Sequence, residues 1–112
     1  MEPLPGYRFE QLVADALDEI PDELQPVLDN VVVQIADRDP HEPDLLGLYH
    51  GVPHTERTGQ EGPDVVTIYR LALCAACDDL DELADEVYVT VIHEIAHVAG
   101  IEDDRLHELG WA

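Results

Sequence analysis

The sequence predicts an α+β fold in which a small, mainly antiparallel or mixed three-stranded sheet packs against a central helix and an N-terminal helix. Apolar residues near the N-terminus recur with helical spacing, three short runs are rich in β-branched residues, and a long C-terminal segment is apolar on nearly every side. A chain of 112 residues has room for one hydrophobic core. We therefore expect a single domain that spans residues 1–112.

The N-terminal segment is expected to form two helices that serve packing. From Phe9 to Ile20, apolar residues follow the i, i+3, i+4, i+7 pattern, and acidic residues occupy the other face. Pro21 ends this helix. With Asp22 and Glu23 it also forms the acidic first turn of a short second helix.

Three strands are expected in the middle of the chain. Val31–Ala36 is rich in β-branched residues and precedes a turn-forming segment, so it predicts a buried strand. Leu45–Gly51 predicts a second strand, in which Gly47 would let another backbone come close. Val65–Leu73 predicts the third. The polar segment Val52–Pro63 carries Gly and Pro and is expected to be a loop.

The eleven residues HEIAHVAGIED carry the candidate chemistry. His93 and His97 are four residues apart, so on a helix they share one face and can bind one metal ion. Glu94 lies beside them and can take a proton from a metal-activated water. Gly100 can end the helix in a left-handed conformation. The chain would then fold back and bring Asp103 to the metal as a third ligand, with a fourth position open for water.

Other readings of the motif stay open. The histidines could form hydrogen bonds inside a core, although two histidines and a glutamate in so apolar a helix would be costly without a metal or full hydrogen bonding. A last short helix would place Asp103 and His107 on one face, which makes His107 the main rival for third ligand and Asp104 a lesser one. If His107 does not bind the metal, it would orient the aspartate.

The pattern HExxHxxGxxD resembles that of the zincin metallopeptidases in which an aspartate replaces the third histidine of HExxHxxGxxH. The resemblance extends through LLGLYHGVPHTER, PDVVTIYRLAL and LHELGWA, so it covers most of the chain. Together these segments look like the mini-zincins, a small bacterial zincin-like metallopeptidase family. The resemblance implies a minimal zincin-like fold and one Zn²⁺ ion held by His93, His97 and Asp103. It further implies hydrolysis of peptide bonds in peptide or protein substrates, with Glu94 as general base.

The resemblance also indicates where a substrate would bind. Zincins hold an extended peptide on an edge strand beside the metal, and the second predicted strand is the candidate. They commonly stabilise the oxyanion with a Tyr or His, and Tyr49, His54, Tyr69 and His107 are available for that role. Arg57, in the predicted loop, is a further candidate for a substrate contact. A catalytically silent metal-binding or peptide-binding module of the same fold is the alternative function.

Cys74 and Cys77 form a C-x-x-C motif just before the predicted long helix Leu80–Ala99, which Asp79 and Glu82 would cap. The helix dipole would lower a thiol pKa, but the surrounding carboxylates would raise it. We interpret the pair as buried or partly buried free thiols. A thiol redox protein is the second alternative function, and two cysteines cannot complete a four-cysteine zinc site.

The composition is strongly acidic. The chain has 26 acidic residues, five arginines and no lysine, for a net charge of −21. Nucleic acid and anionic membranes are therefore poor partners, because both need a basic surface. The charge is interpreted as a solvated acidic surface, and attraction of cationic peptides toward the predicted metal site is the alternative. The sequence shows neither a secretory signal nor an apolar run of about 18 residues, so we expect a cytoplasmic location.

Overall fold

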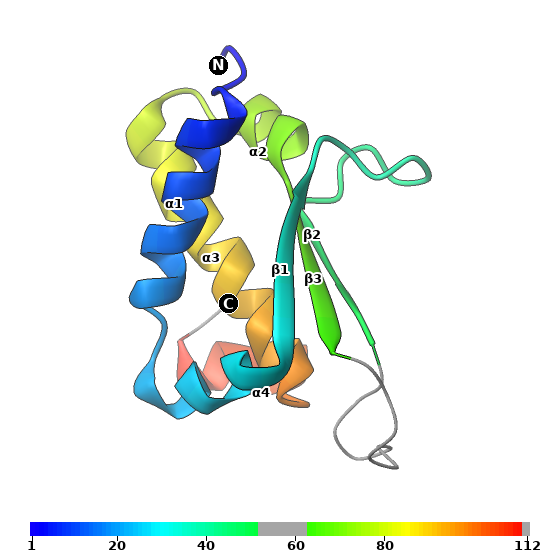
Figure 1. Cartoon of the computed structure of the whole chain (residues 1–112). Coiled ribbons are helices and arrows are strands. Elements are labelled where there is room, and N and C mark those ends of the chain that lie inside the picture. Colours follow the sequence, from blue (N-terminus) through cyan, green and yellow to red (C-terminus); the bar gives the residue numbers. More distant parts are fainter. Residues whose placement is uncertain (52–62, 111–112) are drawn as a thin grey trace.

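The computed structural model describes residues 1–51 and 63–110 and confirms the α+β class (Figure 1). The elements follow one another as α1 (Gly6–Asp18), the 3₁₀ helix η1 (Asp22–Asn30), β1 (Val31–Ala36), β2 (Gly47–His50), β3 (Asp64–Tyr69), α2 (Arg70–Ala76), α3 (Leu80–Val98) and α4 (Asp103–Leu109). Among the helices in the two described ranges, none is both long and apolar enough to span a membrane.

The sheet is mixed, with strand order β1-β3-β2. β1 runs parallel to β3 with Val31 opposite Asp64, and β2 runs antiparallel to β3 with Gly47 opposite Ile68. The central position of β3 explains why nearly all its residues are buried. β2 is consequently an edge strand, the position from which a strand can pair with an added peptide.

Helix α3 lies between α1 and the sheet (Figure 1) and packs against α1, β2 and β3. Its fully buried large apolar residues are Leu83, Val87, Val91, Ile95 and Val98. Burial of a side chain of this size is worth about 1.5–3 kcal/mol relative to exposure. The core therefore holds this helix in place, as predicted for the central element. Val89 is an exception among the apolar residues of this helix, because 38% of the residue is exposed.

The segment from Arg70 to Ala76 differs from the sequence prediction. The third strand was expected to continue to Leu73, but it ends at Tyr69, and α2 follows directly. The residues RLALCAA are mostly Ala, Leu and Arg, which are strong helix formers, and none is β-branched. Leu73 and Cys74 are buried in the same core as α3. An apolar run of this length fits a buried strand or a buried helix, and here tertiary packing favours the helix.

The N-terminal helices agree with the prediction in kind and differ at their ends. Helix α1 starts at Gly6 and ends at Asp18, and the second helix adopts 3₁₀ geometry. Pro26 stands in the middle of that second helix. Because proline lacks an N–H group and its ring collides with the carbonyl four residues earlier, an α-helix is disfavoured there.

Candidate metal centre

His93 and His97 lie on one face at the C-terminal end of α3, as their spacing predicts. Their ring centroids are 4.4 Å apart, and the ring planes meet at 72°. Both side chains are about one-third exposed, so they are open to an ion from solvent. The potential ligand atoms of His93, Glu94 and His97 all lie within 4.8 Å of one another, which makes this group a candidate metal site.

The chain reverses direction directly after this face. Gly100 adopts a positive φ of 83°, which is the left-handed conformation predicted for it. The N–H of Ile101 donates to the carbonyl of Ala96 at 2.9 Å, and the N–H of Gly100 donates to that of His97 at 2.9 Å. This pair of bonds is a Schellman turn, which satisfies the last carbonyls of α3 and starts the chain back toward the histidines.

Asp103, the first residue of α4, reaches the histidines because of that turn. Its Oδ1 atom lies 3.1 Å from Nε2 of His97 and 3.6 Å from Nε2 of His93. Tetrahedral zinc with bonds of about 2.0–2.2 Å holds its ligand atoms about 3.3–3.5 Å apart, so the three side chains fit such an ion.

The contact between His97 and Asp103 also shows why a cation is favoured between these two side chains. The hydrogen bond from His97 lowers the pKa of Asp103, and the nearby imidazoles add to the effect through their charge. A carboxylate and a ring nitrogen that share a proton at 3.1 Å can share a divalent metal ion in its place.

Glu94 is only 8% exposed and lies on the other side of His97. Its Oε1 atom is 3.6 Å from Nδ1 of His97, the ring nitrogen opposite the one that faces Asp103. Oδ1 of Asp103 therefore lies within 3.6 Å of both Nε2 atoms, whereas the Glu94 carboxylate faces the other nitrogen of His97. This arrangement favours Asp103 as the third ligand and leaves Glu94 available for acid–base chemistry.

Gly47 allows β2 to approach the metal centre. A Cβ atom at this position would lie 2.8 Å from Cγ2 of Thr90 and 3.1 Å from Cγ of Glu94, so a larger residue would push the strand and α3 apart. The nearest neighbours that Gly47 admits are thus side chains of α3, and the backbone oxygen of Thr67 follows at 3.4 Å from such a Cβ.

A cavity of about 360 Å³ lies between β2 and α3 next to His93. Its lining residues are Asp44, Leu45, Leu46, Gly47, Glu86, Val89, Thr90, His93 and Glu94. Sequence reasoning missed Asp44 and Glu86 in this wall. The signal for Glu86 was its spacing of two helical turns before His93, which places both on one face of the helix. Asp44 could be found only from the structure, because it comes from a different segment.

Four further residues were candidates for metal binding or substrate contact, and two of them lie on α4. Asp104 and His107 are exposed, and His107 is close enough to lower the pKa of Asp103 through its charge. Within residues 1–51 and 63–110, the aspartate that contacts the two histidines is Asp103. His54 and Arg57, the predicted loop contacts, fall outside the described residues.

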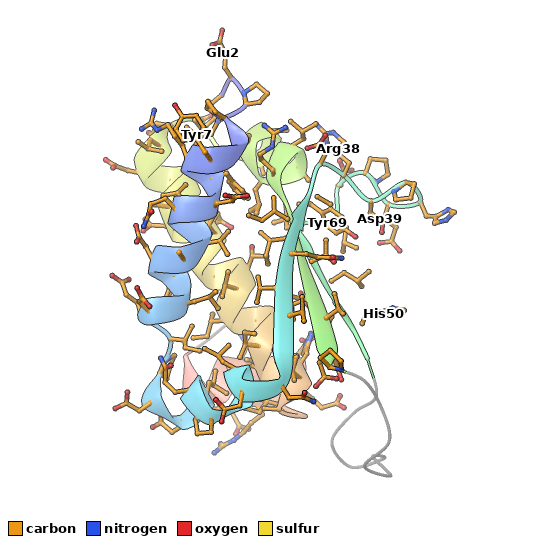
Figure 2. The ribbon with its side chains drawn as sticks, in the orientation of Figure 1. Glu2, Tyr7, Arg38, Asp39, His50 and Tyr69 are labelled. Atoms are coloured by element: carbon orange, nitrogen blue, oxygen red, sulfur yellow. The ribbon has the colours of Figure 1, made fainter. Side chains whose placement is uncertain are left out.

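The two candidate tyrosines form hydrogen bonds with aspartates. The Tyr49 hydroxyl donates to Oδ1 of Asp64, and the Tyr69 hydroxyl donates to Oδ2 of Asp39, each at 3.1 Å. Tyr69 lies toward the end of the sheet that is far from α4 (Figure 2). Burial raises the pKa of Tyr69, and the hydrogen bond to Asp39 raises it further. The structure therefore does not bring Tyr69 to the histidines.

Cys74 and Cys77 are buried free thiols, as predicted. Burial, helped by the carboxylates of Glu82 and Glu86, raises the pKa of Cys77 to about 11. The backbone N–H of Leu4 donates to the sulfur of Cys74 at 3.5 Å. Because the thiolate is the reactive form, a thiol that stays protonated at neutral pH argues against the redox alternative.

Comparisons with known proteins identify the family and support the fold. A family model described as zincin-like metallopeptidase matches residues 28–111, a range that contains every residue of the candidate metal centre. A solved structure of a conserved hypothetical protein from Thermus thermophilus is similar with a TM-score of 0.57 and 22% sequence identity, covering 95% of this chain and 97% of that one. At this identity the similarity speaks for the fold. No curated protein matches the chain.

Proposed function

This chain belongs to the zincin-like metallopeptidase family, and on that premise we propose that it is a zinc-dependent peptidase. His93, His97 and Asp103 would hold one zinc ion, and Glu94 would act as general base. The observation that carries the proposal is the convergence of both Nε2 atoms on Oδ1 of Asp103, at 3.6 and 3.1 Å, with a buried carboxylate alongside.

The chain's own residues account for the proton transfers. The chemistry that zinc supplies in such a site is polarisation of a carbonyl oxygen and a lower pKa for a bound water. Glu94 takes the proton of the attacking water and delivers it to the leaving amine. Its burial strengthens electrostatic interactions with the reacting atoms.

The substrate would lie along β2. This strand is at the edge of the sheet and borders the cavity that His93 and Glu94 also line. Main-chain groups on the free edge of a strand can pair with an extended peptide, and a neighbouring cavity can accept a side chain. A peptide or protein substrate is therefore the partner that we propose.

The test compares Glu94→Gln with the native chain. We expect zinc content, measured by elemental analysis, to stay the same, and cleavage of a peptide library to fall by about 10²–10⁴-fold, because the general base is lost. Glu108→Gln, which removes an exposed carboxylate from α4, is the matched control and should change neither quantity.

Two results would contradict this proposal in different ways. Cleavage that survives in Glu94→Gln would show that another residue is the base. Stoichiometric zinc in a native chain that cleaves no member of a diverse library would select the alternative, a silent metal-binding or peptide-binding module.

A further inference from the structure

The cavity beside the metal centre has a reactive end and an acidic end. His93 and Glu94 stand at one end, and Glu86 lies two helical turns earlier on the same face of α3, about 10 Å along the helix axis. Asp44, in the segment that precedes β2, lines the same cavity and adds a second carboxylate to that of Glu86. Glu86 is half-buried and Asp44 is exposed.

The wall between the two ends is largely apolar. It is formed by Leu45, Leu46, Gly47 and Val89, together with Thr90. The cavity of about 360 Å³ falls in the range of roughly 300–1,000 Å³ that ligand pockets occupy. An apolar wall that ends in carboxylates matches a side chain with a long apolar stem and a cationic head.

We infer that this cavity is a specificity pocket for a lysine or arginine residue next to the cleaved bond, an inference that rests on the proposed peptidase function. The stem of the side chain lies along the apolar wall, and its head reaches Glu86 and Asp44. A span of about 10 Å between the reactive and acidic ends suits these two side chains and is too long for smaller polar ones.

The charges around the cavity also favour a cationic side chain. Among residues 1–51 and 63–110, no arginine lines it, and the chain contains no lysine, so within this part a cationic head meets no basic side chain other than that of His93. An acidic substrate side chain would meet three carboxylates, those of Asp44, Glu86 and the buried Glu94. The net charge of −21 adds a long-range attraction for cationic peptides, which salt screens.

The test uses the zinc-loaded full chain and peptides that are identical except for one residue, which is Lys, Arg, norleucine or Glu. Norleucine has nearly the length of lysine without the charge. We expect kcat/KM to be highest for Lys and Arg and lowest for Glu. Glu86→Gln should lower kcat/KM for the Lys peptide about tenfold, because one charge-assisted hydrogen bond in a partly exposed site is lost, and should leave the norleucine peptide unchanged.

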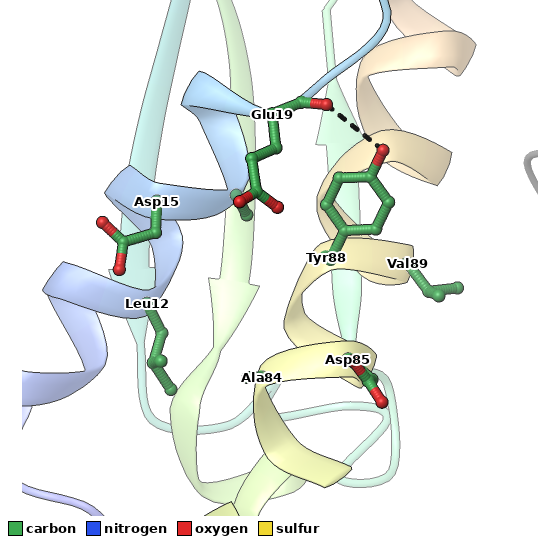
Figure 3. Close-up of a pocket in the computed structure, with 8 residues that line it drawn as sticks. Leu12, Asp15, Glu19, Ala84, Asp85, Tyr88 and Val89 are labelled. Atoms are coloured by element: carbon green, nitrogen blue, oxygen red, sulfur yellow. Dashed lines mark hydrogen bonds between the residues drawn. The ribbon is translucent and has the colours of Figure 1, made fainter. Parts of the chain in front are cut away.

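Asp85→Asn is the matched control. It removes the same charge from the neighbouring residue of α3, but Asp85 lines the groove between α1 and α3 (Figure 3) and does not line the pocket. We expect it to leave the preference for Lys unchanged. If Asp85→Asn lowers kcat/KM for the Lys peptide as much as Glu86→Gln does, the overall negative charge of the protein selects the substrate, and the pocket inference is wrong.

The pocket and the peptidase function can fail separately. Cleavage of all four peptides at equal rates would overturn the pocket and leave the peptidase standing. If nothing is cleaved, calorimetric binding of the same peptides to the native chain decides the question. Tighter binding of the Lys peptide that is lost in Glu86→Gln supports the pocket without the peptidase, and equal binding of Lys and norleucine peptides overturns it.

Discussion

A motif of metal-binding type lies at the C-terminal end of α3, a motif of redox type precedes its N-terminal end, and the two differ in their exposure to solvent. At the C-terminal end, His93 and His97 are about one-third exposed and meet Asp103. Ahead of the N-terminal end, Cys74 and Cys77 are buried. Solvent access therefore separates the two motifs, because an ion can reach the histidines from solvent whereas the cysteines are shielded from it.

The helix dipole alone would favour a cation at the histidine end of α3 and a thiolate at the cysteine end. The C-terminus of a helix stabilises a cation, and the N-terminus lowers the pKa of a nearby thiol, each by about 0.3–1 kcal/mol. At Cys77, however, the pKa rises from its ordinary value of 9.0 to about 11. That rise corresponds to roughly 2–3 kcal/mol, so burial and the neighbouring carboxylates outweigh the dipole. At the histidine end, the dipole and the carboxylates both favour a cation.

The largest expected effect is the loss of zinc at the histidine end. Structural zinc sites bind with about 10–16 kcal/mol over four ligands, so His97→Ala should weaken zinc binding by about 100-fold to 1,000-fold. The double variant Cys74→Ala, Cys77→Ala should bind zinc like the native chain. Competition with a chelator of known affinity measures both. If zinc binding is lost in the double cysteine variant and kept in His97→Ala, the metal site lies at the cysteines and the assignment is wrong.

A smaller effect is expected where α4 meets the histidines. Asp103→Asn replaces a charged ligand by a neutral amide and should weaken zinc binding about 10-fold to 100-fold. Asp104→Asn removes the same charge from the adjacent exposed residue and should leave zinc binding nearly unchanged. The same chelator competition compares the two variants. Equal losses would mean that α4 contributes a general negative field and that Asp103 is not a ligand.

The smallest effect concerns the cysteine end and depends on pH. Below pH 9 the Cys77 thiol is protonated in both the folded and the unfolded chain. Between pH 9 and about 11 the unfolded chain loses this proton first, so stability falls as the pH rises, by roughly 2 kcal/mol for this group. Urea unfolding at pH 8 and pH 10.5 measures the loss. Cys77→Ala should flatten this part of the profile, and an unchanged slope would show that Cys77 is not its source.

Much of the fold follows from local patterns. The first strand was predicted with the bounds that the structure shows, Val31–Ala36, because β-branched residues there are followed by turn residues. The bounds of the long helix differ from the prediction only at Ala99, which caps its C-terminus. Asp79 accepts a hydrogen bond from the N–H of Glu82 at 2.8 Å, which is the predicted cap. Each of these features depends on residues that are close in the sequence.

The length and composition of a segment were less informative where tertiary packing decides between a strand and a helix. The run after Tyr69 was equally compatible with a strand and with a helix, and burial of Leu73 beside α3 selected the helix. The hydroxyl of Tyr49 was a candidate for transition-state stabilisation, and the structure shows its hydrogen bond to Asp64. Asp64 lies on a neighbouring strand, so no local signal indicated it.

For the site, the sequence by itself determined the metal-binding face, because a spacing of four on a helix and a glycine in the left-handed conformation are local properties. Only the tertiary structure decided that β2 is the edge strand beside this face and that Asp44 and Glu86 share a cavity with His93. The physical reason is that strand order and cavity walls depend on contacts between distant segments, which are set by how the whole core packs.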